Sequence, residues 1–318
     1  MVRQGIQWLA ALLAAVLLCN VFLLLYHDPA VWIHQENGPT DAIWRPGARI
    51  LMGTGGRGIH RVDSRGYLNP EKPLAENFVL VVGSSFAQGK EVAAGERFTD
   101  ILNRELSEDA ETLAVYNVSQ DGFYLPDILR CFPALMRDFP GARALVIEIG
   151  TTSFPETAFV PMPAAAGERV RHLPAMPELR EALPILTVAK AQLTALAASE
   201  TAEEAALAGA ETLKQALLEL RQRFAGEILI LYHPAVNLSN GGMAIVEEET
   251  TPAFRAACRE AGVTFVDTSD AFLAAHEEEY LVPYGFFNTT MGSGHLNAHG
   301  HMLCAEALLP LLKGGGAE

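Results

Sequence analysis

The sequence predicts an α/β domain of three layers, with a mostly parallel sheet between two layers of helices, attached to one N-terminal membrane-spanning helix. Short runs of branched and aliphatic residues recur along the chain, and segments with apolar residues at helical spacing separate them. A charge-free apolar stretch stands near the N-terminus. Regular alternation of strands and helices favours parallel pairing, because each parallel connection needs a crossover that covers one face of the sheet.

The first element is the apolar stretch from Gly5 to Tyr26, which is long enough to span a bilayer core of about 30 Å. Arg3 precedes it and Asp28 follows it, so the short tail is expected in the cytoplasm and the remainder outside. A cleavable signal has an apolar run of only about 7 to 15 residues and small residues at the cut. We therefore expect residues 1–27 to form an uncleaved anchor of a single-pass cell-membrane protein whose C-terminal domain is extracytoplasmic.

The remaining chain of about 290 residues is expected to hold one large domain, because no Pro/Ser-rich linker divides it. We assign residues 28–75 to a juxtamembrane lead-in segment and residues 76–315 to the α/β domain. A net charge of −15 argues against a nucleic-acid partner, which needs a basic surface. Three cysteines outside the anchor show no CxxC spacing and predict buried free thiols: Cys131, Cys258 and Cys304. No metal-ligand spacing occurs, so we expect neither metal nor cofactor.

The sheet begins with a predicted strand at 78–82, a continuous branched run that ends at Gly83, as expected of a strand buried on both faces. Four similar runs predict the other strands, at 115–118, 144–149, 228–232 and 263–266. Apolar residues at helical spacing predict the helices, at 96–106, 126–137, 213–224, 251–261 and 300–312. Strand and helix therefore alternate throughout the domain.

Polar turns that contain glycine follow three of these strands, at 83–86, 121–122 and 150–153. In parallel sheets the chemistry collects at the carboxyl ends of the strands. Glycine permits a sharp turn and leaves backbone N–H groups free for an oxyanion. His295 precedes the last helix, from where its imidazole can reach back over the sheet. Serine, bare backbone donors and histidine are the components of an acyl-transfer site.

The segment VLVVGSSFAQGKEVAAGERFTDILNREL resembles the first block of the SGNH (GDSL-type) hydrolases, as does its lead-in VDSRGYLNPEKPLAENF. The resemblance implies an SGNH/flavodoxin-like α/β/α fold, with Ser85 as the nucleophile and Ser84 at the position of the family's aspartate. YNVSQDGFY is similar to the second block, which implies that Gly122 donates its N–H to the oxyanion together with that of Ser85. GSGHLNAHGHMLCAEAL resembles the fifth block, with His295 as general base.

Two positions depart from the family pattern. Thr152 stands where the third block has an oxyanion-donating asparagine, and its hydroxyl can donate one hydrogen bond. Gly292 stands where the fifth block has the aspartate that orients the histidine. Asp267, which closes the strand VTFVD, is the residue that we expect to orient His295 instead. Alternatives are Asp270, Glu148 or a backbone carbonyl.

Further contacts with substrate are expected from Ser84, Phe86, His233 and Asn297, which lie in or near the turns at this edge. Asn297 has a second interpretation as the cap of the last helix or as a support for the histidine loop. A carboxylate inside a buried strand must find a donor or become neutral, so Glu148 is expected to be paired if it is ionised. His299 and His301 are expected at surface positions of the last helix.

The resemblance implies a membrane-anchored serine esterase or O-acyltransferase that acts on ester groups, commonly acetyl, of cell-envelope carbohydrate. Because the asparagine and the aspartate are both replaced, a non-catalytic carbohydrate-binding or envelope-assembly domain is the alternative from a different class. A lipid-directed esterase is a third hypothesis, suggested by the nearby bilayer alone.

Overall fold

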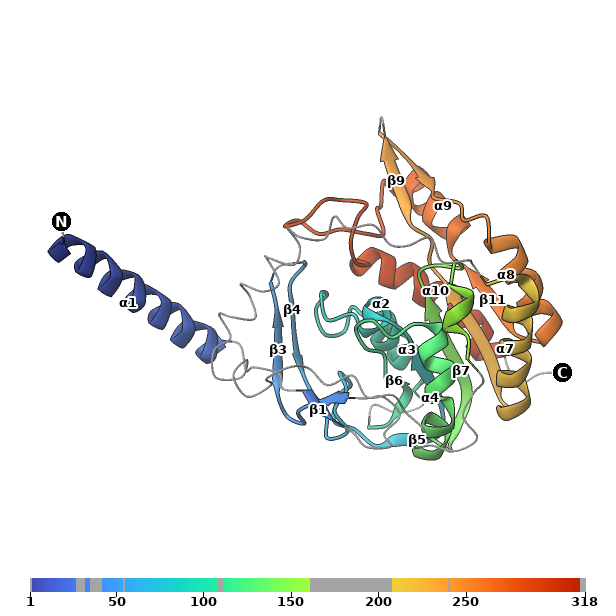
Figure 1. Cartoon of the computed structure of the whole chain (residues 1–318). Coiled ribbons are helices and arrows are strands. Elements are labelled where there is room, and N and C mark those ends of the chain that lie inside the picture. The colour runs from blue at the N-terminus through green and yellow to red at the C-terminus, as the bar shows by residue number, and fades with distance from the viewer. Residues whose placement is uncertain are drawn as a thin grey trace.

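The computed structural model describes residues 2–26, 32–34, 42–53, 55–107, 111–160, 208–239 and 241–314. Its centre is a five-stranded, wholly parallel sheet with helices on both faces, which confirms the predicted α/β/α class (Figure 1). From edge to edge the strands are β11 (Thr264–Asp267), β8 (Glu227–Tyr232), β7 (Ala142–Ile149), β5 (Leu74–Val82) and β6 (Leu113–Asn117).

The alternation of side chains along β5 shows how one apolar run builds two cores. Leu80 and Val82 belong to the core beneath three helices, α4 (Leu125–Asp138), α7 (Ala210–Arg223) and α8 (Thr251–Ala261). Val79 and Val81 belong to the opposite core, beneath α3 (Phe98–Leu106), α9 (Ser269–Glu279) and α10 (Ala298–Gly314). Successive residues of a strand point to opposite faces, so a strand covered on both sides is apolar at every position.

Smaller elements surround this sheet. The antiparallel pairs are β1 (Trp32–His34) with β2 (Ala42–Trp44), β3 (Arg49–Met52) with β4 (Gly58–Arg61), and β9 (Val236–Ser239) with β10 (Gly242–Ile245). A single helical turn, α2 (Ser85–Gln88), follows β5, and a short 3₁₀ helix, η1 (Glu156–Ala158), follows β7.

The lead-in segment is integrated into the α/β domain. Ile43 and Tyr67 are buried within the core beneath α4. Asp63 accepts a hydrogen bond of 2.7 Å from the Tyr116 hydroxyl of β6, and Asn69 exchanges hydrogen bonds with the backbone of Asn117. These contacts make the segment from residue 42 onward a part of the folded unit.

The N-terminal helix α1 (Val2–Tyr26) extends away from the globular part (Figure 1). Its stretch from Arg3 to Phe22 has a mean hydropathy of 2.0 and large exposed apolar side chains, among them Trp8 and Leu18. The helix is long and apolar enough to cross a membrane, a property that a signal sequence shares.

The cysteines outside α1 are buried free thiols on three different helices, as predicted: Cys131 on α4, Cys258 on α8 and Cys304 on α10. Burial raises the pKa of the Cys258 thiol to about 12 and raises that of Cys304 as well. The thiols of Cys258 and Cys304 therefore remain protonated and unreactive at neutral pH.

Candidate active site

The turn after β5 presents Ser85 at the carboxyl edge of the sheet. The chain leaves Val82, passes through Gly83 and enters α2, for which Ser84 is the N-cap and Ser85 the first residue. A Cβ atom at Gly83 would lie 2.7 Å from the Cβ of Glu148 on β7, so only glycine fits there. The strand, sharp turn and helix therefore leave Ser85 half-exposed, between the buried Ser84 and the half-buried Phe86.

The structure brings Ser85 and His295 together, although 210 residues separate them in sequence. Nε2 of His295 lies 2.9 Å from Oγ of Ser85, within hydrogen-bonding distance. The histidine loop is folded back by backbone hydrogen bonds from Gly285 N to His295 O (3.1 Å) and from Asn297 N to Pro283 O (2.9 Å). The hydroxyl can donate to Nε2 when the imidazole is the tautomer with its hydrogen on Nδ1.

Nδ1 of His295 faces Glu91, a residue that the sequence analysis did not select. The distance from Nδ1 to Oε1 of Glu91 is 3.7 Å, too long for a hydrogen bond but short for a charge interaction. The Glu91 side chain is 3 % exposed, and its Oε2 has no hydrogen-bond partner among the described residues. The signal in the sequence was an acidic residue beside the apolar Val92, six residues after the nucleophile.

Burial perturbs both members of this pair. Desolvation raises the pKa of Glu91 to about 7, against the opposing charge of Lys90. Desolvation, assisted by the charge of Lys90, lowers the pKa of His295. A neutral imidazole is the form that can accept a proton from serine, and an ionised Glu91 would stabilise the imidazolium that results.

Asp267 does not take the orienting position that we expected. It lies at the end of β11, where its Oδ1 accepts hydrogen bonds from the N–H (2.9 Å) and hydroxyl (2.5 Å) of Ser269 and its Oδ2 pairs with Arg255 at 2.5 Å. Three strand spacings separate β11 from β5, or roughly 14 Å at about 4.8 Å each. Asp267 thus supports the start of α9, and Asp270 lies on that same distant helix.

A buried polar network lies directly beneath the nucleophile turn. Glu148 accepts hydrogen bonds from the N–H (2.6 Å) and hydroxyl (2.9 Å) of Ser84, and its Oε1 lies 2.6 Å from Nε2 of His233. Nδ1 of His233 lies 2.9 Å from the Tyr284 hydroxyl. Burial disfavours the ionised form of Glu148. The hydrogen bond and charge of His233, together with the hydrogen bonds from Ser84, outweigh this effect and lower the pKa of Glu148.

This network corrects the expectation that Ser84 and His233 contact substrate, because both side chains are buried and paired with Glu148. Phe86 is half-buried and packs between two histidine rings, with centroid distances of 4.7 Å to His233 and 5.0 Å to His295. Phe86 therefore supports the ring of His295 from one side.

Thr152 is not available as the oxyanion donor that we expected. Its N–H and its hydroxyl both donate to Oε2 of Glu248, at 2.5 and 2.7 Å, and its side chain is buried. Its Oγ1 also lies within 3.0 Å of the hydroxyls of Thr250 and Thr251. A hydroxyl has one hydrogen to donate, and the carboxylate of Glu248 takes it.

Two backbone N–H groups remain for an oxyanion. Ser85 is the first residue of α2, a position whose N–H has no partner inside the helix. Gly122 has φ +69° in the turn after β6, and open space surrounds the position of a Cβ there. Among the described residues, neither N–H donates to a protein acceptor.

The residues after His295 have structural roles. Asn297 caps α10, since its Oδ1 accepts from the N–H groups of His299 and Gly300, and its amide donates to the carbonyls of Val282 and Gly285. All of its polar atoms are thus used, which corrects the substrate-binding expectation and supports the capping one.

His301 is buried, which makes the predicted surface position wrong. It stacks on the ring of Phe98, and its Nδ1 accepts from the Phe98 N–H at 3.3 Å. Burial lowers its pKa to about 3, so this ring is neutral. His299 is exposed, as expected.

Comparisons with known proteins give distant similarity to solved structures. Neither a family model nor a curated protein sequence matches this chain. TesA is 16 % identical over 74 % of this chain and 98 % of its own, with a TM-score of 0.41. A variant of Axe2, an acetyl xylan esterase from Geobacillus stearothermophilus, is 16 % identical over 76 % and 96 %, with a TM-score of 0.41. The esterase EstA from Pseudoalteromonas is 12 % identical over 76 % and 98 %, with a TM-score of 0.39. An activity must therefore be argued from the site itself.

Proposed function

We propose that this chain is an SGNH-type serine esterase held at the outer face of a membrane by α1. The observation that carries the proposal is the 2.9 Å contact between Oγ of Ser85 and Nε2 of His295, at the carboxyl end of β5. Two backbone donors without a partner among the described residues, the N–H groups of Ser85 and Gly122, follow β5 and β6 at this edge. Nucleophile, base and oxyanion donors together suit acyl transfer.

The proposed reaction starts when Ser85 attacks the ester carbonyl while Nε2 of His295 takes its proton. The N–H groups of Ser85 and Gly122 hold the negative oxygen of the tetrahedral intermediate. His295 then returns its proton to the leaving alcohol, and an acyl-enzyme forms. Water attacks the acyl group by the same route in reverse, with His295 again as base and then acid. Glu91 acts as a positioning residue, whose negative charge favours the tautomer with its hydrogen on Nδ1 and stabilises the imidazolium.

The substrate class that we propose is a small acyl ester, commonly acetyl, of cell-envelope carbohydrate. The support is the sequence resemblance together with the apolar helix α1, which as an anchor would hold the domain beside the envelope. If the hydroxyl of a second sugar replaces water at the acyl-enzyme, the same site performs O-acyl transfer. The non-catalytic alternative, a carbohydrate-binding or envelope-assembly domain, is favoured by one observation: Glu248 occupies the side chain at the third oxyanion position.

A fluorophosphonate probe tests the proposal, because labelling requires an activated serine. The detergent-solubilised protein should become labelled and should hydrolyse p-nitrophenyl acetate, whereas Ser85→Ala and His295→Ala should each lose on the order of 10⁴-fold or more in rate. Ser84→Ala is the matched control, because its hydroxyl faces Glu148 and α2 and not His295. Absence of both labelling and turnover in the wild type would leave the binding-domain alternative.

A further inference from the structure

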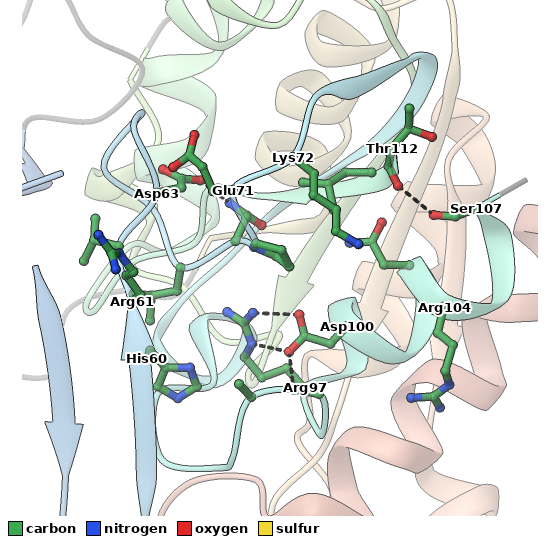
Figure 2. Close-up of a pocket in the computed structure, with 18 residues that line it drawn as sticks. His60, Arg61, Asp63, Glu71, Lys72, Arg97, Asp100, Arg104, Ser107 and Thr112 are labelled. Carbon is green, nitrogen blue, oxygen red and sulfur yellow. Dashed lines mark hydrogen bonds and ion pairs between the residues drawn. The ribbon is translucent and has the colours of Figure 1, made fainter. Parts of the chain in front are cut away.

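A cavity of about 700 Å³ lies between the lead-in segment and α3, and it includes neither Ser85 nor His295. Its walls come from β4, from residues 62–63 and 68–72, from residues 94–107 around α3, and from the start of β6 (Figure 2). Pockets that bind small molecules commonly enclose about 300 to 1,000 Å³. The volume is therefore that of a ligand site and exceeds that of a packing defect.

Arg97 brings a buried guanidinium group to the lining of this cavity. Its side chain is 3 % exposed, and its Nε and Nη2 each donate to Asp100 at 2.7 Å. Its Nη1 is buried and has no hydrogen-bond partner among the described residues. Figure 2 shows the guanidinium beside Asp100, with the ring of His60 nearby. Arginine carries five N–H donors and no acceptor, so a ligand oxygen that reaches Nη1 would satisfy a donor that has no partner among the described residues.

The charges around the cavity favour an anion. Four arginine or lysine residues line it, against three acidic residues, although the whole chain carries a net charge of −15. Each acidic group already accepts hydrogen bonds from the protein: Asp63 from Tyr67, Asn69 and Tyr116, Glu71 from Ser64, and Asp100 from Arg97. Burial lowers the pKa of His60 to about 4, so this ring adds no charge at neutral pH.

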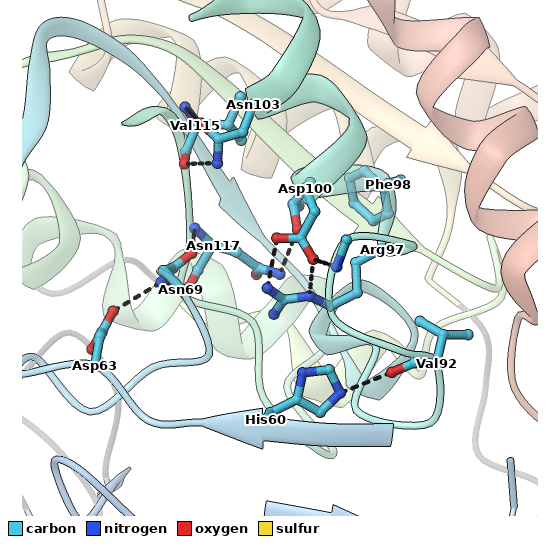
Figure 3. Close-up of polar contacts among 12 residues, drawn as sticks. His60, Asp63, Asn69, Val92, Arg97, Phe98, Asp100, Asn103, Val115 and Asn117 are labelled. Atoms are coloured by element: carbon cyan, nitrogen blue, oxygen red, sulfur yellow. Dashed lines mark hydrogen bonds and ion pairs between the residues drawn. The ribbon is translucent and has the colours of Figure 1, made fainter. Parts of the chain in front are cut away.

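The uncharged polar groups of the lining are also occupied. The Asn103 amide bonds the N–H and carbonyl of Val115, at 2.8 Å each. Asn69 bonds the side chain of Asp63 and the backbone of Asn117 (Figure 3). The Ser107 hydroxyl donates to the carbonyl of Thr112. A neutral hydroxylic ligand would thus find few partners here, whereas an anion finds the guanidinium groups.

We propose that this cavity binds a small molecule that carries a phosphate or carboxylate group. The anionic oxygens accept from Nη1 of the buried Arg97, and the exposed Arg61 and Arg104 at the rim supply further positive charge. Phosphate and carboxylate share the acceptor geometry that guanidinium groups recognise. The remaining volume of the cavity accommodates the organic part of the ligand, up to about the size of a sugar.

Calorimetric titration of the full chain in detergent tests this site with four probes: inorganic phosphate, glucose 6-phosphate, glucuronate and glucose. We expect saturable binding of at least one anionic probe and none of glucose. The phosphate and glucuronate arms distinguish the two sources of negative charge. Arg61→Gln should weaken binding about tenfold, and Arg97→Lys, which retains the charge but lacks Nη1, should weaken it at least as much. Arg259→Gln is the matched control, an exposed arginine on α8 across the sheet.

The proposal is overturned if no anionic probe binds at millimolar concentration, or if glucose binds as well as the anions do. It is overturned equally if Arg61→Gln and Arg97→Lys both bind with wild-type affinity. If the melting curve shows that Arg97→Lys does not fold, Arg61→Gln alone tests the proposal, because the side chain of Arg61 is exposed and its replacement should not disturb folding. Binding is measured without turnover, so this test stands or falls independently of the esterase proposal.

Discussion

Replacement of Glu91 by glutamine should slow ester hydrolysis without altering the Ser85–His295 contact. Glutamine has nearly the same shape but carries no charge, so it retains the packing of a side chain that is 3 % exposed. What it removes is the interaction between the carboxylate and the imidazolium that forms when His295 takes the serine proton. This interaction is stronger in the transition state than in the resting site, so its loss lowers kcat more than it raises KM.

The magnitude follows from the 3.7 Å separation between Glu91 Oε1 and His295 Nδ1. Two unit charges at about this distance interact with about 1 kcal/mol in bulk water and about 4 kcal/mol at an effective dielectric constant of 20. Glu91 is buried and His295 is 35 % exposed, so the pair lies between these limits. The corresponding loss of rate is roughly five- to 1,000-fold.

The pH dependence gives a second readout that a merely structural role would not change. The pKa of Glu91 is raised to about 7, so the carboxylate becomes ionised, and able to stabilise the imidazolium, as the pH rises through that value. In the wild type kcat/KM should therefore increase with pH around 7, with apparent values that belong to the Glu91–His295 pair. In Glu91→Gln only His295 of this pair titrates, and its pKa is lowered from 6.5. The rise of kcat/KM with pH should therefore move to a pH below 6.5.

The assay is the rate of p-nitrophenyl acetate hydrolysis between pH 5.5 and 9, with circular dichroism to verify folding. Glu96→Gln is the matched control, because Glu96 lies in the same loop and is exposed. Asp267→Asn should also leave the rate unchanged, since Asp267 pairs with Arg255. A folded Glu91→Gln protein with less than a threefold loss and an unshifted pH profile would refute the role of Glu91 and favour a Ser–His dyad.

Three further outcomes are expected. A chain that starts near Asp28 should be soluble and retain the melting transition of the full chain, whereas a chain that starts at residue 76 should lose it, because the lead-in contacts with β6 are removed. Glu148→Gln should lower the urea-measured free energy of unfolding at pH 7 by about 3 to 5 kcal/mol, since it breaks a buried pair. The pKa of Glu148 in the folded protein lies below its ordinary value of 4.5, so the ionised carboxylate contributes its full stabilisation above pH 4.5. The difference in unfolding free energy between the wild type and Glu148→Gln should therefore shrink as the pH falls below 4.5. Thr152→Val should retain turnover within about threefold yet destabilise the fold by about 1 to 3 kcal/mol, because Glu248 loses a buried donor; a loss of 100-fold would restore Thr152 as an oxyanion donor.

The sheet could be predicted from the sequence because strands buried on both faces are continuous apolar runs. Each predicted strand overlaps an observed one, with bounds that differ by a few residues, as at 78–82 within Leu74–Val82. The resemblance to the SGNH hydrolases implied the pairing of Ser85 with His295. General topology agrees with it, since turns at the carboxyl ends of parallel strands meet at one edge.

The assignments that failed depended on information that local patterns do not carry. Asp267 closes a strand, but its distance from His295 depends on the order of strands, and β11 lies at the far edge from β6. The burial of His301 depends on which side of α10 meets Phe98 of α3. Glu91 lies in an irregular loop, whose course is determined by distant contacts such as those from His60 to the carbonyls of Lys90 and Val92.

The geometry at Gly292 favours an orienting carboxylate from a different part of the chain, as we propose for Glu91. Gly292 stands where the SGNH hydrolases that the sequence resembles have an aspartate, but it has φ +81°, a conformation that residues with a side chain rarely adopt. A Cβ atom there would also lie 2.8 Å from the side chain of Leu238 on β9. An aspartate at this position would therefore require a new course for the histidine loop and a shift of the Leu238 side chain. A glutamate in the loop after α2 requires neither change, because Glu91 approaches Nδ1 of His295 from beside the nucleophile turn.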